Sequence, residues 1–290
     1  MSSSFHGLEA FHGPVPTVMP DDGRSIPGTV QTRRSPMPDL ANLRALVIGI
    51  ANDKSIATGC ARALAQAGAR LAVTYLNDKA KPFVEPVARE LGAELLLPLD
   101  VEAADQPEAL LAEIARTWGG LDVIVHSVAF APRDDLHGPV TRSTREGFAR
   151  AMDVSCHSFL RLLGAAVPLM PNGGAAMTVS YYGAEKAVAH YGIMGPVKAA
   201  LEAAVRYAAV ELGPQGISVN ALSPGPLATR AASGIDHFGD LMQRAAEVAP
   251  EGRLVTIDEV GALAAFLASR PARAITGEVI HVDAGYNVVG

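Results

Sequence analysis

The sequence predicts a doubly wound, Rossmann-like α/β fold on a seven-stranded parallel sheet. From Arg44 onward, β-branched apolar runs alternate with segments of helical period, a pattern typical of a parallel sheet covered by helices on both faces. The 290 residues are 49% hydrophobic and only 19% charged, so the chain can bury a sizeable core. No repeat or linker interrupts residues 44–290, which favours a single domain.

Individual elements follow from the same patterns. Two long amphipathic helices are predicted at 148–166 and 197–212, and a third begins at Thr256, whose hydroxyl and the Glu259 carboxylate can form a capping box. Residues 223–252 have no clear period and are rich in Gly, Pro and Ala, so we expect a long loop or substrate-binding lid. The expected strands are 44–50, 70–76, 94–99, 121–127, 175–180, 217–222 and 278–283.

The amino-terminal segment 1–36 differs from the rest of the chain. Fourteen of its residues are Pro, Gly or Ser and no periodicity appears, so we expect a disordered tail before a folded domain at 37–290. A second hypothesis is that translation starts at Met37, seven residues before the first strand-like run. A targeting or regulatory arm is the alternative.

Charge and composition exclude several classes of function. A net charge of −6 gives no attraction to nucleic acid or anionic lipid, and no apolar run approaches the roughly 18 residues of a membrane span. Cys60 and Cys156 lie in apolar, helix-like stretches, which indicates buried thiols in a reducing cytoplasm. The histidines are scattered without metal-ligand spacing, so no metal site is expected.

The first strand runs through Gly49 into a helix, where a doubly wound fold binds pyrophosphate on free helix amides. The usual G-x-G-x-x-G is absent, because only Gly49 and Gly59 remain. A kinase-type P-loop is excluded by Asp53, which stands where that loop needs glycine. An ordinary strand-to-helix turn is the simpler alternative.

The ends of the second and third strands would meet the adenosine of a dinucleotide. Leu76 offers neither the acid expected for NAD nor the arginine expected for NADP, so the choice of nucleotide stays open here. Asp100 and Val101 follow the third strand, where a carboxylate can bind the adenine amino group. An aspartate that merely leads into a helix is an equally good interpretation of Asp100.

Two tyrosine–lysine pairs follow the fifth strand. Tyr182 and Lys186 have the Y-x3-K spacing of ordinary short-chain dehydrogenases, but Tyr182 stands only two residues after Ser180 at the strand end. Tyr191 and Lys198 are seven residues apart, which is two helical turns, and Tyr191 stands 11 residues after Ser180, so we expect both on one face of the same helix. Spacing alone leaves both pairs open.

A resemblance separates the two pairs. Tyr181, Tyr191 and Lys198 resemble the Y-x9-Y-x6-K signature of NADH-dependent bacterial enoyl-[acyl-carrier-protein] reductases. The resemblance extends from the first strand to the last and so covers 44–290. Its other blocks are 49–51 with 55–57, His126-Ser-Val-Ala-Phe-Ala-Pro132, 223–229 with 231–235, and Gly277-Glu-Val-Ile-His-Val-Asp283.

The resemblance implies hydride transfer from a nicotinamide to the β-carbon of a trans-2-enoyl thioester carried by acyl carrier protein. Tyr191 would donate to the enolate oxygen, Lys198 would hold the nicotinamide ribose and tune the tyrosine, and Tyr181 would lie near the thioester. The family further implies a homotetramer in the cytoplasm.

The same resemblance implies the binding residues. Ala129, Tyr181, Tyr191 and Phe238 would contact substrate, with Met242 lining the acyl channel beside Phe238. The expected NAD contacts are Gly49, Ala51, Ser55 and Ile56 at the pyrophosphate, Asp100 and Val101 at the adenine, Ser127, Val128 and Ala129 with Lys198 at the nicotinamide riboside, and Leu227 with Thr229 at the carboxamide side.

Three positions depart from the family pattern. Leu76 replaces a polar residue and keeps NADPH open as the nucleotide, while Ala284 and Pro196 also differ. These departures indicate a divergent paralogue. Two alternatives therefore accompany the main prediction: a ketone or alcohol dehydrogenase using Tyr182 and Lys186, and a non-catalytic NAD(H)-binding module. Glu202, like Glu185 and Lys186, is expected to be solvated at a helix end, and His190 to lie on a helix surface.

Overall fold

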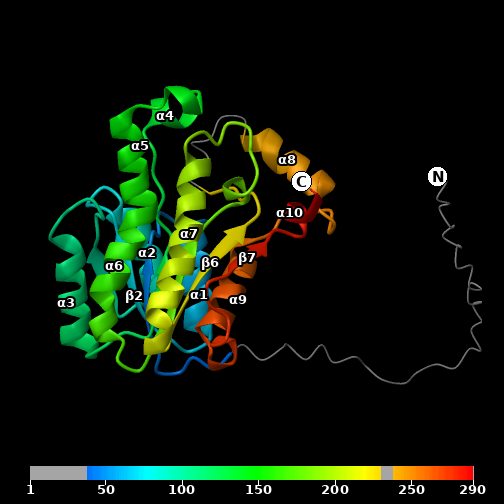
Figure 1. Ribbon diagram of the computed structural model, residues 1–290. Coiled ribbons are helices and arrows are strands. Elements are labelled where there is room, and N and C mark those ends of the chain that lie inside the picture. The colour runs from blue at the N-terminus through cyan, green and yellow to red at the C-terminus, as the bar shows by residue number, and fades with distance from the viewer. Residues whose placement is uncertain (1–37, 230–237, 290) are drawn as a thin grey trace, which may run out of the picture. The chain divides into compact units, whose positions relative to one another are not determined.

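A computed structural model describes residues 38–229 and 238–289, which form a parallel sheet between two layers of helices (Figure 1). The strand order is β3-β2-β1-β4-β5-β6-β7, and each predicted strand is confirmed to within two residues at either end. The order reverses between β1 and β4, the point at which doubly wound sheets bind ligands. The strands are β1 Arg44–Ile48, β2 Arg70–Tyr75, β3 Leu95–Pro98, β4 Val123–His126, β5 Gly174–Val179, β6 Ile217–Pro224 and β7 Val279–Val282. The predicted tail 1–36 lies outside the described residues.

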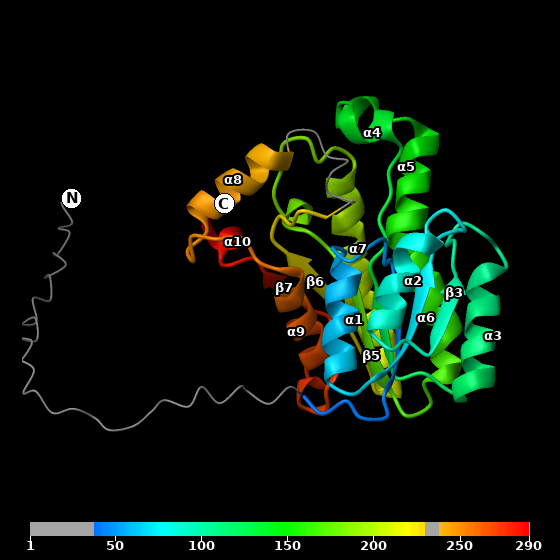
Figure 2. The same cartoon turned by 180° about the vertical axis from the view of Figure 1, so that it is seen from behind.

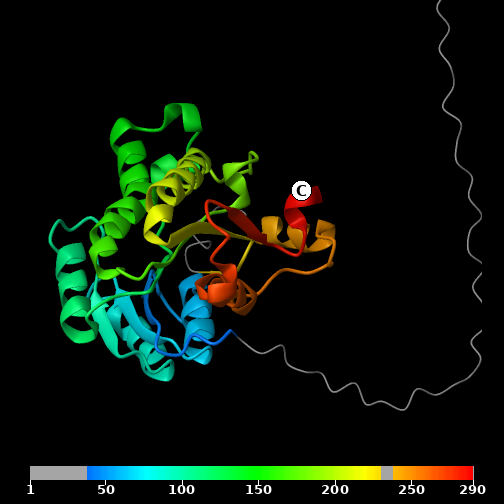
Figure 3. The same cartoon turned by 60° about the horizontal axis from the view of Figure 1, so that its bottom comes forward.

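Helices cover both faces of the sheet. α3, α5, α6 and α7 lie on the face seen in Figure 1, and α1, α2 and α9 lie on the face seen in Figure 2. The view from below separates α6 and α7 from α1 and α9 (Figure 3). Val123 and Val125 join the core under α1 and α9, whereas Ile124 between them joins the core under α6 and α7, as the two-residue period of a strand requires. These helices are α1 Ile56–Gln66, α2 Lys81–Glu90, α3 Gln106–Trp118, α5 Arg145–Met152, α6 Ser158–Ala166, α7 Met194–Leu212 and α9 Ile257–Ala268.

The contact between α1 and α9 brings two backbones together. A Cβ added to Gly59 would lie 2.1 Å from the carbonyl oxygen of Ile257, and one added to Gly261 would lie 2.2 Å from the carbonyl oxygen of Gly59. At the start of α9, Thr256 and Glu259 form the predicted capping box. Side chains larger than hydrogen at the two glycines would therefore push α9 away from the start of α1.

The helix predicted at 148–166 is present but not uniform. α5 and α6 are joined by a π-helical turn, Asp153–His157, because Ser155 is drawn to the backbone of Phe130 on the neighbouring loop. The hydroxyl of Ser155 accepts from the Phe130 amide at 2.8 Å and donates to its carbonyl at 2.9 Å. Short turns of π-helix of this kind often occur at functional sites.

The prediction of one long loop at 223–252 is wrong for two parts of that segment. β6 continues to Pro224, and α8 occupies Phe238–Val248. The helix was missed because Ala245 and Ala249, which are one turn apart, are small residues that pack beside Tyr182 and Tyr286. Residues 230–237 lie outside the described part of the chain, so a lid there stays a prediction. The remaining α-helices in the described residues are the short α4 (Arg133–His137) and α10 (Tyr286–Val289).

The described residues, 38–229 and 238–289, contain no helix long and apolar enough to cross a membrane. Within the same ranges, no group of His, Cys, Asp and Glu side chains could hold a metal ion.

Candidate active site

The predicted site residues gather along one edge of the sheet. Gly49 follows β1, Asp100 follows β3, Ser127 follows β4, Tyr181 follows β5 and Leu227 follows β6. Because all seven strands are parallel, their carboxyl ends share this edge, and residues far apart in sequence meet there.

The turn from β1 into α1 is shaped by glycine and serine. Gly49 has a φ of 100°, and a Cβ there would lie 2.0 Å from the carbonyl oxygen of Ser127. The buried Ser55 hydroxyl accepts from the amides of Ala51 and Asn52, both at 3.0 Å. Ser55 therefore folds the loop by its own side chain, and Ile56 begins the helix whose first amides point out of the turn.

A cavity of about 270 Å³ adjoins this turn. It is lined by Lys54 from the turn, Ile257 from α9 and the buried Leu227 after β6, among others. The Thr229 amide donates to the Leu227 carbonyl at 2.8 Å, which makes a tight turn in the segment that lines the cavity. This place fits the pyrophosphate of a dinucleotide. The first amides of α1 are free, the Lys54 ammonium is near, and Gly49 has no Cβ at the switch point.

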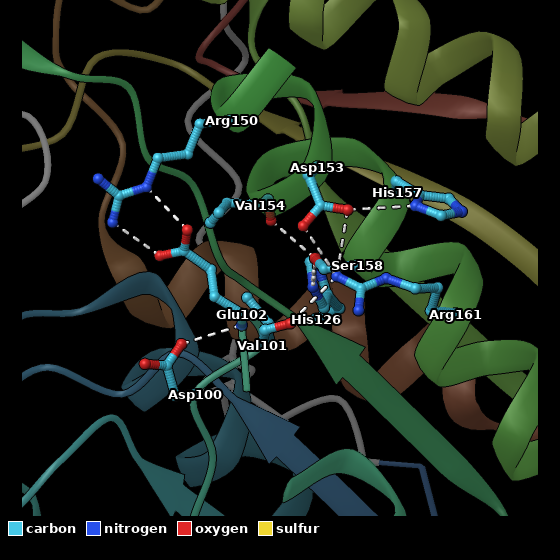
Figure 4. Close-up of polar contacts among 10 residues, drawn as sticks. All are labelled: Asp100, Val101, Glu102, His126, Arg150, Asp153, Val154, His157, Ser158 and Arg161. Atoms are coloured by element: carbon cyan, nitrogen blue, oxygen red, sulfur yellow. Dashed lines mark hydrogen bonds and ion pairs between the residues drawn. The ribbon is translucent and has the colours of Figure 1, made fainter. Parts of the chain in front are cut away.

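The loop after β3 is tied to the helices beside it (Figure 4). Asp100 accepts from the Glu102 amide at 3.0 Å, so one of its carboxylate oxygens shapes the turn. Arg161 donates to the Val101 carbonyl at 3.1 Å, and Arg150 makes a two-bond pair with Glu102 at 2.7 and 2.8 Å. These arginines were not anticipated from the sequence, because their partners lie about fifty to sixty residues away.

The loop after β4 lies between Gly49 and the π-helical turn. Ser127 and Val128 are half-buried and Ala129 is exposed. His126, at the end of β4, is fully buried, and its Nε2 lies 2.9 Å from the Ser158 hydroxyl. Burial and the nearby Lys198 lower the pKa of His126 to about 3, so its ring is neutral.

Tyr191 is not on the helix that carries Lys198, and that prediction is wrong. α7 begins at Met194, and Tyr191 lies in the turn before it. The chain reverses through His190, which has a φ of 62° and is exposed on this turn, not on a helix surface. Tyr191 is nevertheless buried, with its ring centroid 4.8 Å from that of Tyr181.

The two phenols are kept neutral by their surroundings. Burial raises the pKa of Tyr191 and of Tyr181 above the usual value. The Tyr181 hydroxyl is buried and has no hydrogen-bond partner among the described residues, 38–229 and 238–289. A buried donor without a partner carries a free-energy penalty, which a bound acceptor would remove.

Lys198 lies on the buried face of α7. Its Nζ donates to the Val179 carbonyl at the end of β5 at 2.6 Å, which leaves two further N–H donors. Burial lowers the pKa of Lys198 to about 8, while Cys156 and Glu202 favour the charged form. The predicted burial of Cys156 is confirmed, and desolvation raises the pKa of its thiol.

The competing pair has a different geometry. Tyr182 is buried against Tyr286, with ring centroids 5.3 Å apart, in the small cluster beside α8. The exposed Lys186 places its Nζ 5.3 Å from the centroid of the Tyr182 ring, over the ring face. An ammonium over the face of a ring makes a cation–π contact and does not polarise the phenol hydroxyl. This geometry argues against Tyr182 and Lys186 as the catalytic pair.

Glu202 is a further residue of this region that was misjudged from the sequence. Glu202, expected to be solvated, is 7% exposed and accepts a hydrogen bond from the Ser180 hydroxyl at 2.5 Å. The signal in the sequence was that Glu202 stands four residues after Lys198 on an apolar helix face, which puts both side chains on one side of the helix.

The acyl-channel residues stay a prediction. Met242 is half-buried on α8, and the side chain of Phe238 lies outside the described part of the chain.

The fold and this edge define a nucleotide-dependent oxidoreductase of the short-chain dehydrogenase type. The family model described as enoyl-(acyl carrier protein) reductase matches residues 49–287, and the chain belongs to that family. Enoyl-[acyl-carrier-protein] reductase [NADH] 1 of Rhizobium meliloti is 46% identical over 85% of this chain and 91% of its own. The Escherichia coli enoyl-[acyl-carrier-protein] reductase [NADH] is 45% identical over 86% and 95%.

Solved structures agree with these sequence relatives. The enoyl reductase of Anaplasma phagocytophilum, in complex with NAD, has a TM-score of 0.84 and 45% identity, covering 87% of this chain and 97% of its own. The Bacillus cereus enoyl reductase, with NADP+ and an indole naphthyridinone, has a TM-score of 0.85 and 40% identity, covering 88% and 100%. The predicted family and fold are confirmed.

Proposed function

We propose that the chain reduces the trans-2 double bond of an enoyl thioester carried by acyl carrier protein, with hydride from NADH, in fatty acid biosynthesis. The observation that carries this proposal is the group of the buried Tyr191 and Lys198 and the half-buried Tyr181, whose hydroxyl is buried, at the carboxyl edge of the sheet. The family membership and the relatives named as NADH enzymes support it.

When bound, NADH supplies hydride to the β-carbon, which leaves negative charge on the thioester oxygen. Tyr191 donates its hydroxyl hydrogen bond to that oxygen, and burial keeps the phenol protonated until charge develops. Lys198 would hold the nicotinamide ribose hydroxyls through its ammonium group, and the positive charge of that group would strengthen donation by the tyrosine. Tyr181, whose buried hydroxyl lacks a partner among the described residues, directs it toward the substrate thioester.

The dinucleotide would lie across the switch point between β1 and β4. Gly49, Ala51, Ser55 and Ile56 form the pyrophosphate turn, and the absence of a Cβ at Gly49 lets the β4 loop approach. The adenine would lie at Asp100 and Val101, the nicotinamide riboside at Ser127, Val128, Ala129 and Lys198, and the carboxamide side at Leu227 and Thr229. Leu76 is 52% exposed and adds no polar contact to the adenosine end.

The acyl chain would contact Ala129 and Phe238 beside the two tyrosines. Assembly into a cytoplasmic homotetramer is part of the same proposal. It is supported by Tyr207 and Val210 on α7, which are each 80% exposed although large and apolar.

The test compares Tyr191→Phe with wild type by the loss of NADH absorbance in the presence of a trans-2-enoyl thioester. Removal of one oxyanion donor is expected to lower kcat by about 10²–10³. Tyr207→Phe removes a hydroxyl from an exposed tyrosine of α7 and serves as the matched control, with an unchanged rate.

Two results would overturn the proposal. Full activity of Tyr191→Phe together with loss of activity in Tyr182→Phe would favour a ketone or alcohol dehydrogenase. Saturable NADH binding by the wild-type protein without turnover of any enoyl thioester would favour a non-catalytic module.

A further inference from the structure

The side chains of Lys198 and Glu202 hold α7 against the end of β5, where they bind two consecutive residues, Val179 and Ser180. Lys198 donates to the carbonyl of Val179, and Glu202, one helical turn later, accepts from the hydroxyl of Ser180. Lys198 is 5% exposed and Glu202 is 7% exposed, so a cation and a carboxyl share one buried face of the helix. The next residue of the strand end is Tyr181.

Two neighbouring groups favour the charged form of Lys198, first Cys156 on the π-helical turn and then Glu202 on α7. Burial raises the pKa of the Cys156 thiol, so this group is neutral, and the ring of His126 at the end of β4 is neutral as well. Burial alone disfavours an ammonium, and among these neighbours Glu202 is the carboxyl group that acts on Lys198.

Neighbouring groups shift the pKa of Glu202 in both directions. Burial and Glu185 raise the pKa of Glu202, whereas the Ser180 hydroxyl, His281 on β7 and Arg206 lower it. His281 in turn lies 3.3 Å from Glu185, measured from Nε2 to Oε1. These three groups favour the carboxylate but offset burial only in part, so the pKa of Glu202 stays above its usual value.

We propose that Glu202 is a positioning residue that holds Lys198 in its ammonium form at the end of β5. The inference deepens the proposed function, because it assigns the charge state of the lysine that would hold the nicotinamide ribose. Glu202 would thereby set the pH range in which the nucleotide binds tightly, although Glu202 itself does not touch the nucleotide.

The test measures the dissociation constant of NADH by fluorescence titration as a function of pH. In wild type, affinity should weaken above about pH 8, as Lys198 loses its proton. Glu202→Gln keeps the shape of the side chain but removes its charge. The fall in affinity at high pH, called here the alkaline limb, should then begin about one pH unit lower than in wild type. Glu202→Asp keeps the charge and should restore the wild-type limb.

Two controls separate charge from structure. Glu211→Gln makes the same charge change at an exposed position of α7 and should leave the pH profile unchanged. Ser180→Ala removes the hydrogen bond but keeps the carboxyl, so the limb should stay within about half a pH unit of wild type. The melting temperature of each variant reports whether it is folded.

A folded Glu202→Gln protein with the wild-type pH profile would overturn the inference, as would an equal shift in Glu211→Gln. If Glu202→Gln does not fold, Glu202→Asp is the deciding variant. Because Glu202→Asp keeps a carboxylate, an alkaline limb about one pH unit below that of wild type would contradict a charge effect. Binding is measured without any thioester, so a protein that binds NADH but reduces no enoyl substrate would sink the proposed function and leave this inference standing.

Discussion

The two halves of the sheet hold their parts of the site by different means. On the side of β1 to β3, Gly49, Ser55 and Asp100 act through backbone geometry and through hydrogen bonds to residues two to four positions away. On the side of β4 to β7, buried ionisable groups such as His126 and Lys198 make contacts that span tens of residues. The first half should therefore respond to steric change, and the second half to pH.

The largest expected effect tests the steric half. Gly49→Ala places a Cβ 2.0 Å from the Ser127 carbonyl oxygen at a φ of 100°, and should lower the free energy of unfolding by about 3 kcal/mol or more. Gly119→Ala is the matched control, because Gly119 also has a positive φ, 68°, but no atom within 4 Å of the added Cβ. It should lose only about 1 kcal/mol. Urea denaturation measures both, and equal losses would show that backbone conformation alone sets the requirement.

The next effect tests the ionisable half. His126 has a pKa of about 3 in the folded chain against about 6.5 when unfolded, so the unfolded state binds the proton more readily. Stability should therefore fall as the pH drops below about 6.5, and this loss should level off near pH 3. From about pH 7.5 to about pH 5.5 the contribution of His126 amounts to about 1.4 kcal/mol.

The measurement is the free energy of unfolding in urea at those two pH values. His126→Gln should remove this part of the pH dependence, whereas His157→Gln should keep it, since His157 is largely exposed. If the pH response of His126→Gln matches wild type, another group is responsible for the acid sensitivity.

The same contrast explains what the sequence could predict. The strands and the capping box of α9 are local patterns, so the architecture was predicted almost completely. Tyr191 was misplaced because the helical period from Val197 onward does not show where the helix begins, and its first residue is Met194, three residues after Tyr191. Glu202 was misread because a carboxyl beside an apolar helix face normally lies at the solvent-exposed edge of that face. Its burial depends on the hydrogen bond from Ser180, twenty-two residues earlier.

The smallest expected effect returns to the first half of the sheet. Arg150 and Glu102 fasten the loop after β3, but their side chains are 51% and 37% exposed, so solvent and salt screen the pair. Arg150→Gln should change the dissociation constant of NADH by less than about threefold, and the difference should shrink at high salt. Arg89→Gln, whose partner Glu85 is also exposed, controls for net charge. A loss above about tenfold would mean that the adenosine loop needs this tie as firmly as the buried half needs its charges, and the contrast between the halves would fail.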